Sequence, residues 1–460
     1  MPSRRKRNAD PGWPHDEDIV RRAPAELAAH EIPLGWEVDP PQRLGFDPEA
    51  PPPQEQRLVA YAGDAHVMTV ARTGAGKGRG CTIPWLLHLR NPAIVLDVKG
   101  EAYNVTARYR RDVLGHRIVL LDPFGLCGGK DALNPFDLIR KDHIDIDAEA
   151  LTELFQDGRP VSTKDPFWDN TARSFFVGCV AHIATAHKHP SPVALRDLLL
   201  DDNVPLRLAT LLDNKAVQSE LARREFATFL NHEQEKVRTS VLSTAQQNLR
   251  PFAAESVARA MSTSTLKLDD VIRGEPATIY LAMPPENLAS HGSVLRLWVG
   301  TLLQAVTRRR QRVPRNTVFL LDEIAQCGTL PILRQAMSLL RGYGLTTVTL
   351  WQDLAQLQRN YDDWRSLMNN CAVIQTFGTS TFEMARTMGE VIGVTPHQLR
   401  GMQSGEAMVA PAGKEPFVVR RLDYLRDAMF AGRAVENPWF RTGRRRRAVR
   451  DGDGARELGQ

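Results

Sequence analysis

The sequence VMTVARTGAGKGRG, at residues 67–80, decides how the rest of the chain is interpreted. It begins with a short apolar run and continues into a cluster of glycines around Lys77. The apolar run predicts a buried strand, and the glycines predict a loop whose backbone N–H groups point inward at an anion. The segment CTIPWLLHL follows and predicts a helix whose positive dipole end faces the same anion. The stretch therefore predicts a strand, a phosphate-binding loop and a helix, in that order.

The loop follows the P-loop pattern G-x-x-x-x-G-K-[ST] with two departures. Ala71 stands at the first glycine, and Gly78 stands where a hydroxyl residue normally binds Mg²⁺. Glycine suits such a loop because phosphate oxygens approach the backbone too closely for a Cβ, and because some positions need a positive φ. A flexible glycine-rich linker is the alternative, but the apolar segments on both sides argue against it. Pro84 predicts that the helix bends or restarts there.

Composition sets broad limits on the class of protein. A chain of 460 residues can form two or three domains, and 42% hydrophobic with 25% charged residues is typical of a soluble globular protein. No apolar run approaches the roughly 18–20 residues that span a bilayer, and the N-terminal sequence has no signal-peptide core. The five cysteines are scattered and form no CxxC pair, which favours a reduced, cytosolic compartment.

The net charge of +5 lies at the two ends of the chain. The first ten residues carry +3 and residues 441–460 carry +4, which leaves −2 for everything between them. Any contact of the body with nucleic acid must therefore come from local patches. For the basic tail two interpretations stay open: solvated disorder, or contact with nucleic acid or acidic lipid. Residues 1–59 are rich in proline and polar residues and are interpreted as an extended leader that is either laid on a surface or partly disordered.

Strand and helix signals alternate along most of the chain and predict an α/β fold with a parallel sheet covered by helices on both faces. Between about residues 145 and 268 only helical spacing is found, which predicts an all-helical insertion. Ligands of such sheets bind at the carboxyl ends of the strands, so Asp97, Lys99 and Asp122 are expected on the same rim as the glycine loop if their strands are adjacent. Strands are predicted at residues 67–71, 93–97, 277–285 and 371–379, in residues 117–125 with a turn after the strand, in the four apolar residues that precede Asp322, and in the segment from residue 345 that exits at Gln352.

Two adjacent carboxylates, Asp322 and Glu323, follow directly on a buried strand. Their chemical explanation is that the first holds hydrated Mg²⁺ while the second polarises an attacking water. A helix N-cap with an acid in the first turn would explain only one of them. Gln352, at another strand exit, could sense a terminal phosphate or cap the next helix. The arginines that close the segment before residue 316 fit either a helix dipole or a DNA-facing patch; they are Arg308, Arg309, Arg310, Arg312 and Arg315.

Taken together, these stretches resemble the type IV secretion coupling proteins, the TraG/TraD family of conjugation ATPases. The resemblance covers roughly residues 60–438 and is carried by several motifs in the family's order. It implies a RecA-like P-loop NTPase with a parallel-rich central sheet and an inserted all-α domain. The nucleotide-binding domain would then comprise residues 60–144 and 269–438, with the insertion at 145–268, the N-terminal extension at 1–59 and the basic, disordered tail at 439–460. The matching segments are ARTGAGKGRGCTIPWLL, VLDVKGEAYNVTA, VLLDPFG, DPFWDNTARSF, LLDEIAQCGTLPIL, LRGYGL and LWQDLAQLQRNY.

The resemblance also implies ATP and Mg²⁺ as ligands and assigns roles to individual residues. Lys77 would contact the β- and γ-phosphates, Asp322 would hold Mg²⁺ through water, and Glu323 would activate the attacking water. Gln352 would sense the γ-phosphate, and Arg341 would be the finger offered to a neighbouring subunit's ATP. The residues expected to cradle the nucleotide are Thr73, Gly74, Ala75, Gly76, Lys77 and Gly78.

For the whole protein, the resemblance implies a DNA-dependent ATPase that assembles as a homo-hexamer on DNA. It would pass single-stranded DNA with its relaxase, or effector proteins, into a type IV secretion channel, with the inserted helices facing the cargo. The family's usual N-terminal membrane helices are not found in residues 1–59, so we expect a cytoplasmic or peripheral protein that meets the membrane only through partners. Two alternatives stay open: a soluble FtsK/HerA-like DNA translocase, and a nucleotide-binding cargo receptor that hardly hydrolyses ATP.

Overall fold

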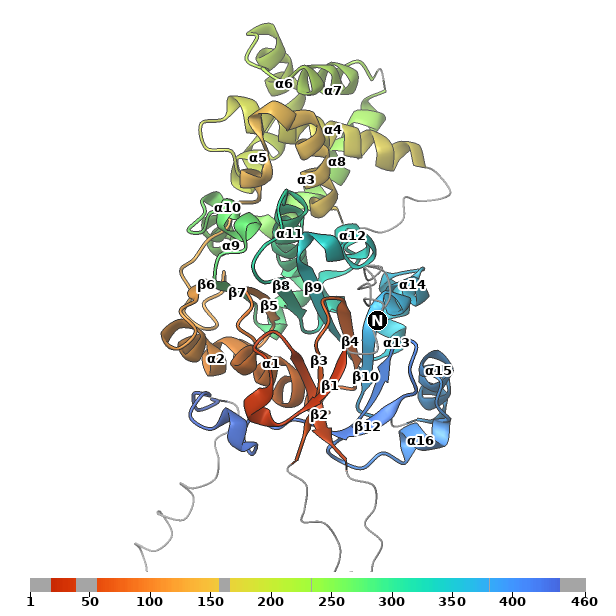
Figure 1. The fold of residues 1–460 in the computed structure, drawn as a ribbon. Coiled ribbons are helices and arrows are strands. Elements are labelled where there is room, and N and C mark those ends of the chain that lie inside the picture. Colours follow the sequence, from red (N-terminus) through yellow and green to blue (C-terminus); the bar gives the residue numbers. More distant parts are fainter. Residues whose placement is uncertain (1–17, 39–55, 157–165, 233, 380, 439–460) are drawn as a thin grey trace, which may run out of the picture.

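The computed structural model describes residues 18–38, 56–156, 166–232, 234–379 and 381–438 (Figure 1). Across these residues one sheet of 12 strands runs through the molecule in the spatial order β1-β3-β2-β12-β11-β10-β4-β9-β8-β5-β7-β6. No helix in the described part of the chain is both long enough and apolar enough to cross a membrane. All five cysteines are free, and four of them are buried.

Seven neighbouring strands, from β10 to β6, run parallel to one another, as the alternation of strand and helix signals predicts. Most of their residues are buried, because a parallel sheet is covered on both faces. The strands expected at 277–285 and 371–379 end earlier than predicted, at Ala282 and Thr376. The seven are β4 (His66–Val70), β5 (Ala93–Asp97), β6 (Arg117–Leu121), β7 (Ala277–Ala282), β8 (Thr317–Leu321), β9 (Leu345–Trp351) and β10 (Cys371–Thr376).

Helices cover both faces of this parallel half, as expected. Successive side chains of a strand point to opposite faces, so Val95 joins one hydrophobic cluster while Ile94 and Leu96 join another. The cluster of Val95 includes residues of α1 (Ile83–His88) and α2 (Glu101–Asp112). The other cluster includes residues of α11 (Leu288–Thr307), α12 (Pro331–Leu339), α13 (Leu354–Asn360), α14 (Trp364–Asn369), α15 (Phe382–Ile392) and α16 (Pro396–Arg400).

An antiparallel half extends the sheet, and the sequence analysis did not predict it. Its strands are β1 (Ile19–Arg22), β2 (Ile32–Glu37), β3 (Leu58–Tyr61), β11 (Glu406–Pro411) and β12 (Phe417–Arg420). The interpretation of residues 1–59 as an extended leader, laid on a surface or partly disordered, is therefore wrong for the described part of that stretch, which forms strands of the sheet. The physical reason is long-range pairing: Trp36 of β2 lies opposite Arg420 of β12. Residues 1–17, 39–55 and the tail at 439–460 lie outside the described residues.

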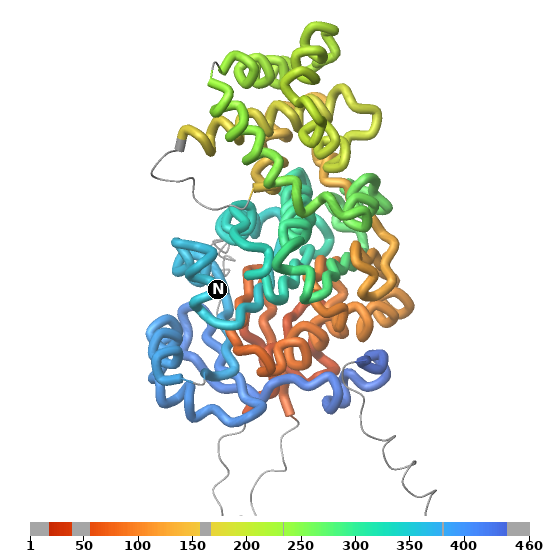
Figure 2. The backbone as a smooth tube through the Cα atoms, turned by 180° about the vertical axis from the view of Figure 1, so that it is seen from behind, coloured from red at the N-terminus to blue at the C-terminus, as the bar shows by residue number. Residues whose placement is uncertain are grey.

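Between β6 and β7 the described residues form helices and no strand, which confirms the helical spacing of that stretch. The longest helix, α4, packs against α7 and α8, and α3 packs on α11, where a Cβ on Gly300 would lie 2.4 Å from Leu154. Figures 1 and 2 show α4 to α8 projecting from the body at one end of the molecule. The helices are α3 (Ile144–Phe155), α4 (Pro166–Ala186), α5 (Pro192–Leu199), α6 (Val204–Asp213), α7 (Glu220–Leu230), α8 (Glu235–Leu249), α9 (Glu255–Ser262) and α10 (Leu268–Arg273).

The arginine run after α11 divides into structural and exposed members. Arg309 is buried, and its guanidinium donates to the Thr317 hydroxyl at 2.6 Å and to four backbone carbonyls. Arg308 pairs with Asp147 of α3 at 3.3 Å. These two arginines therefore join α3, α10, α11 and β8. A DNA-facing patch in this run is left to the exposed residues Arg310, Arg312 and Arg315.

Candidate functional site

The glycine loop after β4 has the backbone geometry that its sequence predicts. Gly74 has a φ of 77° and Gly76 a φ of 90°, a region that residues with a Cβ rarely adopt. The chain then enters a π-helix, Gly78–Thr82, and continues as α1, whose first turn contains Pro84. Proline cannot donate a backbone hydrogen bond to the turn before it, and here that turn is the wider π-helix. The predicted restart at Pro84 is confirmed.

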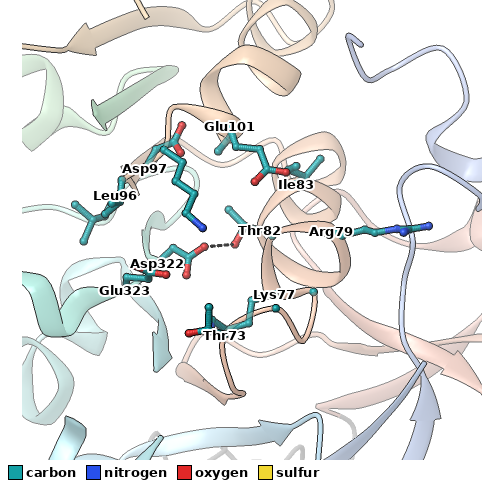
Figure 3. Close-up of a pocket in the computed structure, with 16 residues that line it drawn as sticks. Thr73, Lys77, Arg79, Thr82, Ile83, Leu96, Asp97, Glu101, Asp322 and Glu323 are labelled. Carbon is teal, nitrogen blue, oxygen red and sulfur yellow. Dashed lines mark hydrogen bonds between the residues drawn. The ribbon is translucent and has the colours of Figure 1, made fainter. Parts of the chain in front are cut away.

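Lys77 is enclosed by the loop. Its side chain is buried, and Nζ donates to the carbonyl oxygen of Ala71 at 2.7 Å. Burial lowers the pKa of this ammonium, while the charges of Asp322 and Glu323 raise it. The lysine charge is therefore held inside the loop, directly across from the two acids that end β8 (Figure 3).

Asp322 and Glu323 occupy unusual positions. Asp322 accepts a hydrogen bond from the Thr82 hydroxyl at its Oδ2, and its buried Oδ1 has no hydrogen-bond partner among the described residues. Burial raises the pKa of Asp322 to about 6, although the charge of Lys77 lowers it. Glu323 has a φ of 54°, and the short helix Ile324–Cys327 follows. A left-handed non-glycine residue costs of order 1–3 kcal/mol, and such strain gathers at functional sites.

One cavity of about 290 Å³ joins the loop, the end of β5 and the paired acids. The strands β4, β9, β8 and β5 are consecutive in the sheet, so residues at their carboxyl ends meet at one rim. Asp97 lines this cavity and accepts from the backbone N–H of Tyr103 at 2.8 Å. Burial raises the pKa of Asp97 to about 7. Lys99 and Glu101 also line the cavity, and Glu101 accepts from Asn437 at 2.7 Å.

Asp122, expected on the same rim, has a different role. Its carboxylate accepts from the backbone N–H groups of Leu126, Cys127 and Gly129 at 2.9, 2.7 and 3.2 Å. Asp122 follows β6, the edge strand at one end of the sheet, and it is not among the residues that line the cavity. Asp122 thus lies at the carboxyl edge of the parallel strands, as expected, but β6 is not adjacent to β4, and this carboxylate satisfies the backbone of its own turn.

Gln352 follows β9, which lies between β4 and β8 in the sheet, but it is not among the residues that line the cavity of the paired acids. It lines a second cavity of about 360 Å³ together with Thr73 and Arg72, so Thr73 borders both cavities. The residue that caps the next helix is Asp353, whose carboxylate accepts from the Gln356 N–H at 2.7 Å. The alternative role of Gln352 as a helix cap is thus taken by its neighbour.

Arg341 lies far from the loop of its own chain. It precedes β9 and pairs at 2.7 Å with Asp64, which precedes β4, whereas the loop follows β4. The length of a five-residue strand therefore separates Arg341 from the loop, roughly 15 Å or more. Both side chains of the pair are partly exposed. Arg341 cannot act at the loop of its own chain in this arrangement.

Residues that follow β12 contact the glycine loop and the π-helix after it, and the sequence analysis did not predict these contacts. Arg421 donates from Nη1 to the Ala75 carbonyl oxygen and lies over the Phe377 ring, 4.7 Å from its centroid. Arg79 donates to Asp423 at 2.6 Å. More than 300 residues separate Arg421 from Ala75 and Arg79 from Asp423 in sequence, so no local pattern could have indicated these two contacts. Thr82 was also missed, although a hydroxyl four residues after Gly78 was a readable signal.

Comparison with known proteins places the chain among conjugation proteins. Residues 46–395 match the family model for the type IV secretory system conjugative DNA transfer proteins. The conjugal transfer protein TraG of Escherichia coli is 25% identical over 361 residues, 73% of this chain and 56% of that protein. Protein VirD4 of Rhizobium radiobacter is 25% identical over 409 residues, 79% of this chain and 57% of that protein. The chain thus spans less than two thirds of the length of these relatives.

Solved structures of the plasmid coupling protein TrwB share the fold. The complex of TrwB with the non-hydrolysable ATP analogue ADPNP has a TM-score of 0.63 at 15% identity, covering 81% of this chain and 90% of that one. The complex of TrwB with ADP and Mg²⁺ has a TM-score of 0.62 at 14% identity, covering 80% and 88%. This likeness confirms the predicted fold: a RecA-like P-loop NTPase sheet, mostly parallel, with inserted helices.

Proposed function

The chain belongs to the type IV secretory system conjugative DNA transfer family, and on that premise we propose that it is an ATP-driven coupling protein. It hydrolyses ATP at the loop of residues 73–78 and uses the energy to deliver single-stranded DNA with its relaxase, or protein cargo, to a type IV secretion machine. One observation carries the proposal: Lys77 and the pair Asp322–Glu323 converge on a single cavity at the carboxyl ends of β4 and β8.

The loop is suited to the phosphates of a nucleotide. Gly74 and Gly76 have positive φ, a conformation in which backbone N–H groups can turn toward an anion, and Lys77 places a cation beside them. Thr73, Gly74, Ala75, Gly76 and Gly78 form the rest of the cradle in this proposal. Gln352, which lines the second cavity together with Thr73, would respond to the terminal phosphate.

The donor set at the end of β8 also fits Mg²⁺. A hard cation prefers carboxylate oxygens and water, and Asp322 offers a buried oxygen with no hydrogen-bond partner among the described residues. Asp322 would hold Mg²⁺ through water, and the bound ion would neutralise charge on the phosphates. Glu323, held next to Asp322 in a strained conformation, would orient and polarise the attacking water.

Hydrolysis would depend on assembly. Arg341 cannot act at the loop of its own chain. If it is an arginine finger, it would therefore act at the ATP of a neighbouring subunit. Such a head-to-tail arrangement closes into a ring, and a homo-hexamer is the proposed form. The projecting helices of residues 145–268 would face cargo. The relatives' names, conjugal transfer protein and coupling protein, support DNA transfer as the task.

The experiment that tests the proposal measures phosphate release by the purified chain with and without single-stranded DNA. We expect Mg²⁺-dependent ATP hydrolysis that DNA stimulates and that Lys77→Ala abolishes. Lys141→Ala, which changes an exposed lysine of the short helix Lys141–His143, is the matched control and should leave the rate unchanged. Equal rates of phosphate release by wild type and Lys77→Ala would refute the proposal that the chain is an ATP-driven coupling protein. Tight ATP binding without hydrolysis in any assembly would favour the cargo-receptor alternative, for which Ala71 and Gly78 are the supporting residues.

A further inference from the structure

Nothing in the structure requires glycine at position 78. The φ of Gly78 is not in the left-handed range, in contrast to Gly74 and Gly76. A Cβ built on Gly78 would meet as its nearest atom a Glu101 carboxylate oxygen at 3.7 Å, an ordinary contact. A serine would therefore fit at this position, and the missing hydroxyl is not the consequence of a crowded or strained backbone.

A different hydroxyl contacts Asp322. Thr82 lies four residues after Gly78, about one helical turn away, and lines the same cavity. It is only 3% exposed, and its Oγ1 donates to Asp322 Oδ2 at 3.3 Å (Figure 3). A threonine inside a helix commonly donates back to a carbonyl of its own preceding turn. The Thr82 hydroxyl instead makes its hydrogen bond across to the end of β8.

This contact fixes how Asp322 presents its two oxygens. With Oδ2 engaged by Thr82, the acceptor capacity that remains is mainly at Oδ1, which is buried and has no hydrogen-bond partner among the described residues. Groups that hydrogen-bond to a metal-binding carboxylate set its orientation and typically change metal affinity by roughly 10- to 100-fold when removed.

We propose that Thr82 is the positioning residue that replaces the absent hydroxyl at Gly78: it holds Asp322 in the orientation that receives hydrated Mg²⁺ beside a bound nucleotide. The inference rests on the proposed nucleotide-binding function and adds to it how the magnesium position is organised in this chain. Thr82 is not a catalytic residue, because it acts through Asp322.

The test measures the affinity of the full chain for a fluorescent ADP analogue, once with Mg²⁺ and once with EDTA. For wild type we expect tighter binding with Mg²⁺. Thr82→Val should reduce that gain about tenfold and leave the affinity in EDTA unchanged, because the phosphate loop itself is intact. Thr82→Ser should retain the gain. Thr301→Val is the matched control, since the hydroxyl of Thr301 donates only within its own helix, to Leu297 at 2.7 Å.

A second variant keeps the test decisive. The double variant Thr82→Val with Gly78→Ser returns a hydroxyl next to Lys77 and should recover the Mg²⁺ gain. The inference is overturned if Thr82→Val keeps the full gain, or if it loses affinity equally with Mg²⁺ and with EDTA while Gly78→Ser restores nothing. If wild type binds no nucleotide under either condition, the proposed function itself fails, which is a different result.

Discussion

Arg341→Ala separates two roles for the same side chain: a finger for a neighbouring subunit's ATP, and support for the fold. The structure allows the folding cost to be estimated. Arg341 pairs with Asp64 at 2.7 Å, and the two side chains are 32% and 52% exposed. Ion pairs this open to solvent contribute about 0.2–1 kcal/mol, because water and salt screen them. Loss of the pair should therefore leave the protein folded and still able to bind ATP.

The effect on hydrolysis should be far larger than the effect on folding. An arginine that stabilises charge on the transferring phosphoryl group accounts for about 10³-fold or more in rate. Arg341→Ala should thus release phosphate at least about 10³-fold more slowly than wild type with an ATP affinity close to normal. Asp64→Asn is the matched control, because it removes the same ion pair and keeps the arginine. It should retain most of the activity.

Mixing two inactive variants tests whether the finger acts between subunits. Arg341→Ala keeps an intact loop, and Lys77→Ala keeps an intact finger. In randomly mixed rings of equal parts, roughly a quarter of the sites would combine an intact loop with an intact neighbouring finger. Phosphate release should therefore reappear on mixing. No recovery, or an Asp64→Asn variant as inactive as Arg341→Ala, would refute the assignment of Arg341 as a finger.

Three further predictions concern Gln352, the buried Arg110 and Asp97. Gln352→Ala should bind ADP with an affinity within about twofold of wild type but hydrolyse ATP at least about tenfold more slowly. The reason is that Gln352 contacts only the terminal phosphate in the proposal, and titration and phosphate release measure the two effects. Arg110→Leu should lower the free energy of unfolding in urea by about 3 kcal/mol or more, since the buried Arg110 donates to the carbonyls of Leu86, Leu89 and Asn91, which would lose their partner. The third concerns Asp97, whose pKa burial raises to about 7 from 3.8. The unfolded chain releases that proton first, so this group's contribution to stability is full below about pH 4 and is lost as the pH rises to about 7. Asp97→Asn should therefore gain stability relative to wild type across that window in urea unfolding, and a constant difference between the two proteins would contradict the assignment.

The parallel half of the fold could be predicted because its signals are local. Each buried strand is a short apolar run, and several end directly at a polar residue, such as Asp97 or Asp322. The antiparallel half could not be predicted in the same way. The sequence IPLGWE of β2 is short and follows proline-rich and charged residues, and its partner β12 lies almost 400 residues later. Strand pairing across such a long stretch of sequence produces no local pattern in either segment that would reveal it.

The candidate site shows the same division. The glycine loop, Lys77 and the two acids could be predicted from the sequence because residue type and spacing define their chemistry. Asp122 reaches the expected edge of the sheet but does not join the cavity, because a carboxylate after a strand is equally suited to the backbone N–H groups of its own turn. Arg421 contacts the loop from the far end of the chain, so only the folded structure reveals it.

Direct titration of ATP onto the purified chain, with single-stranded DNA present and absent, tests the central claim most directly. We expect saturable, Mg²⁺-strengthened binding that Lys77→Ala removes, because its ammonium is the cation enclosed by the loop. The absence of any ATP binding by the wild-type chain, in every assembly state and with or without DNA, would contradict the account.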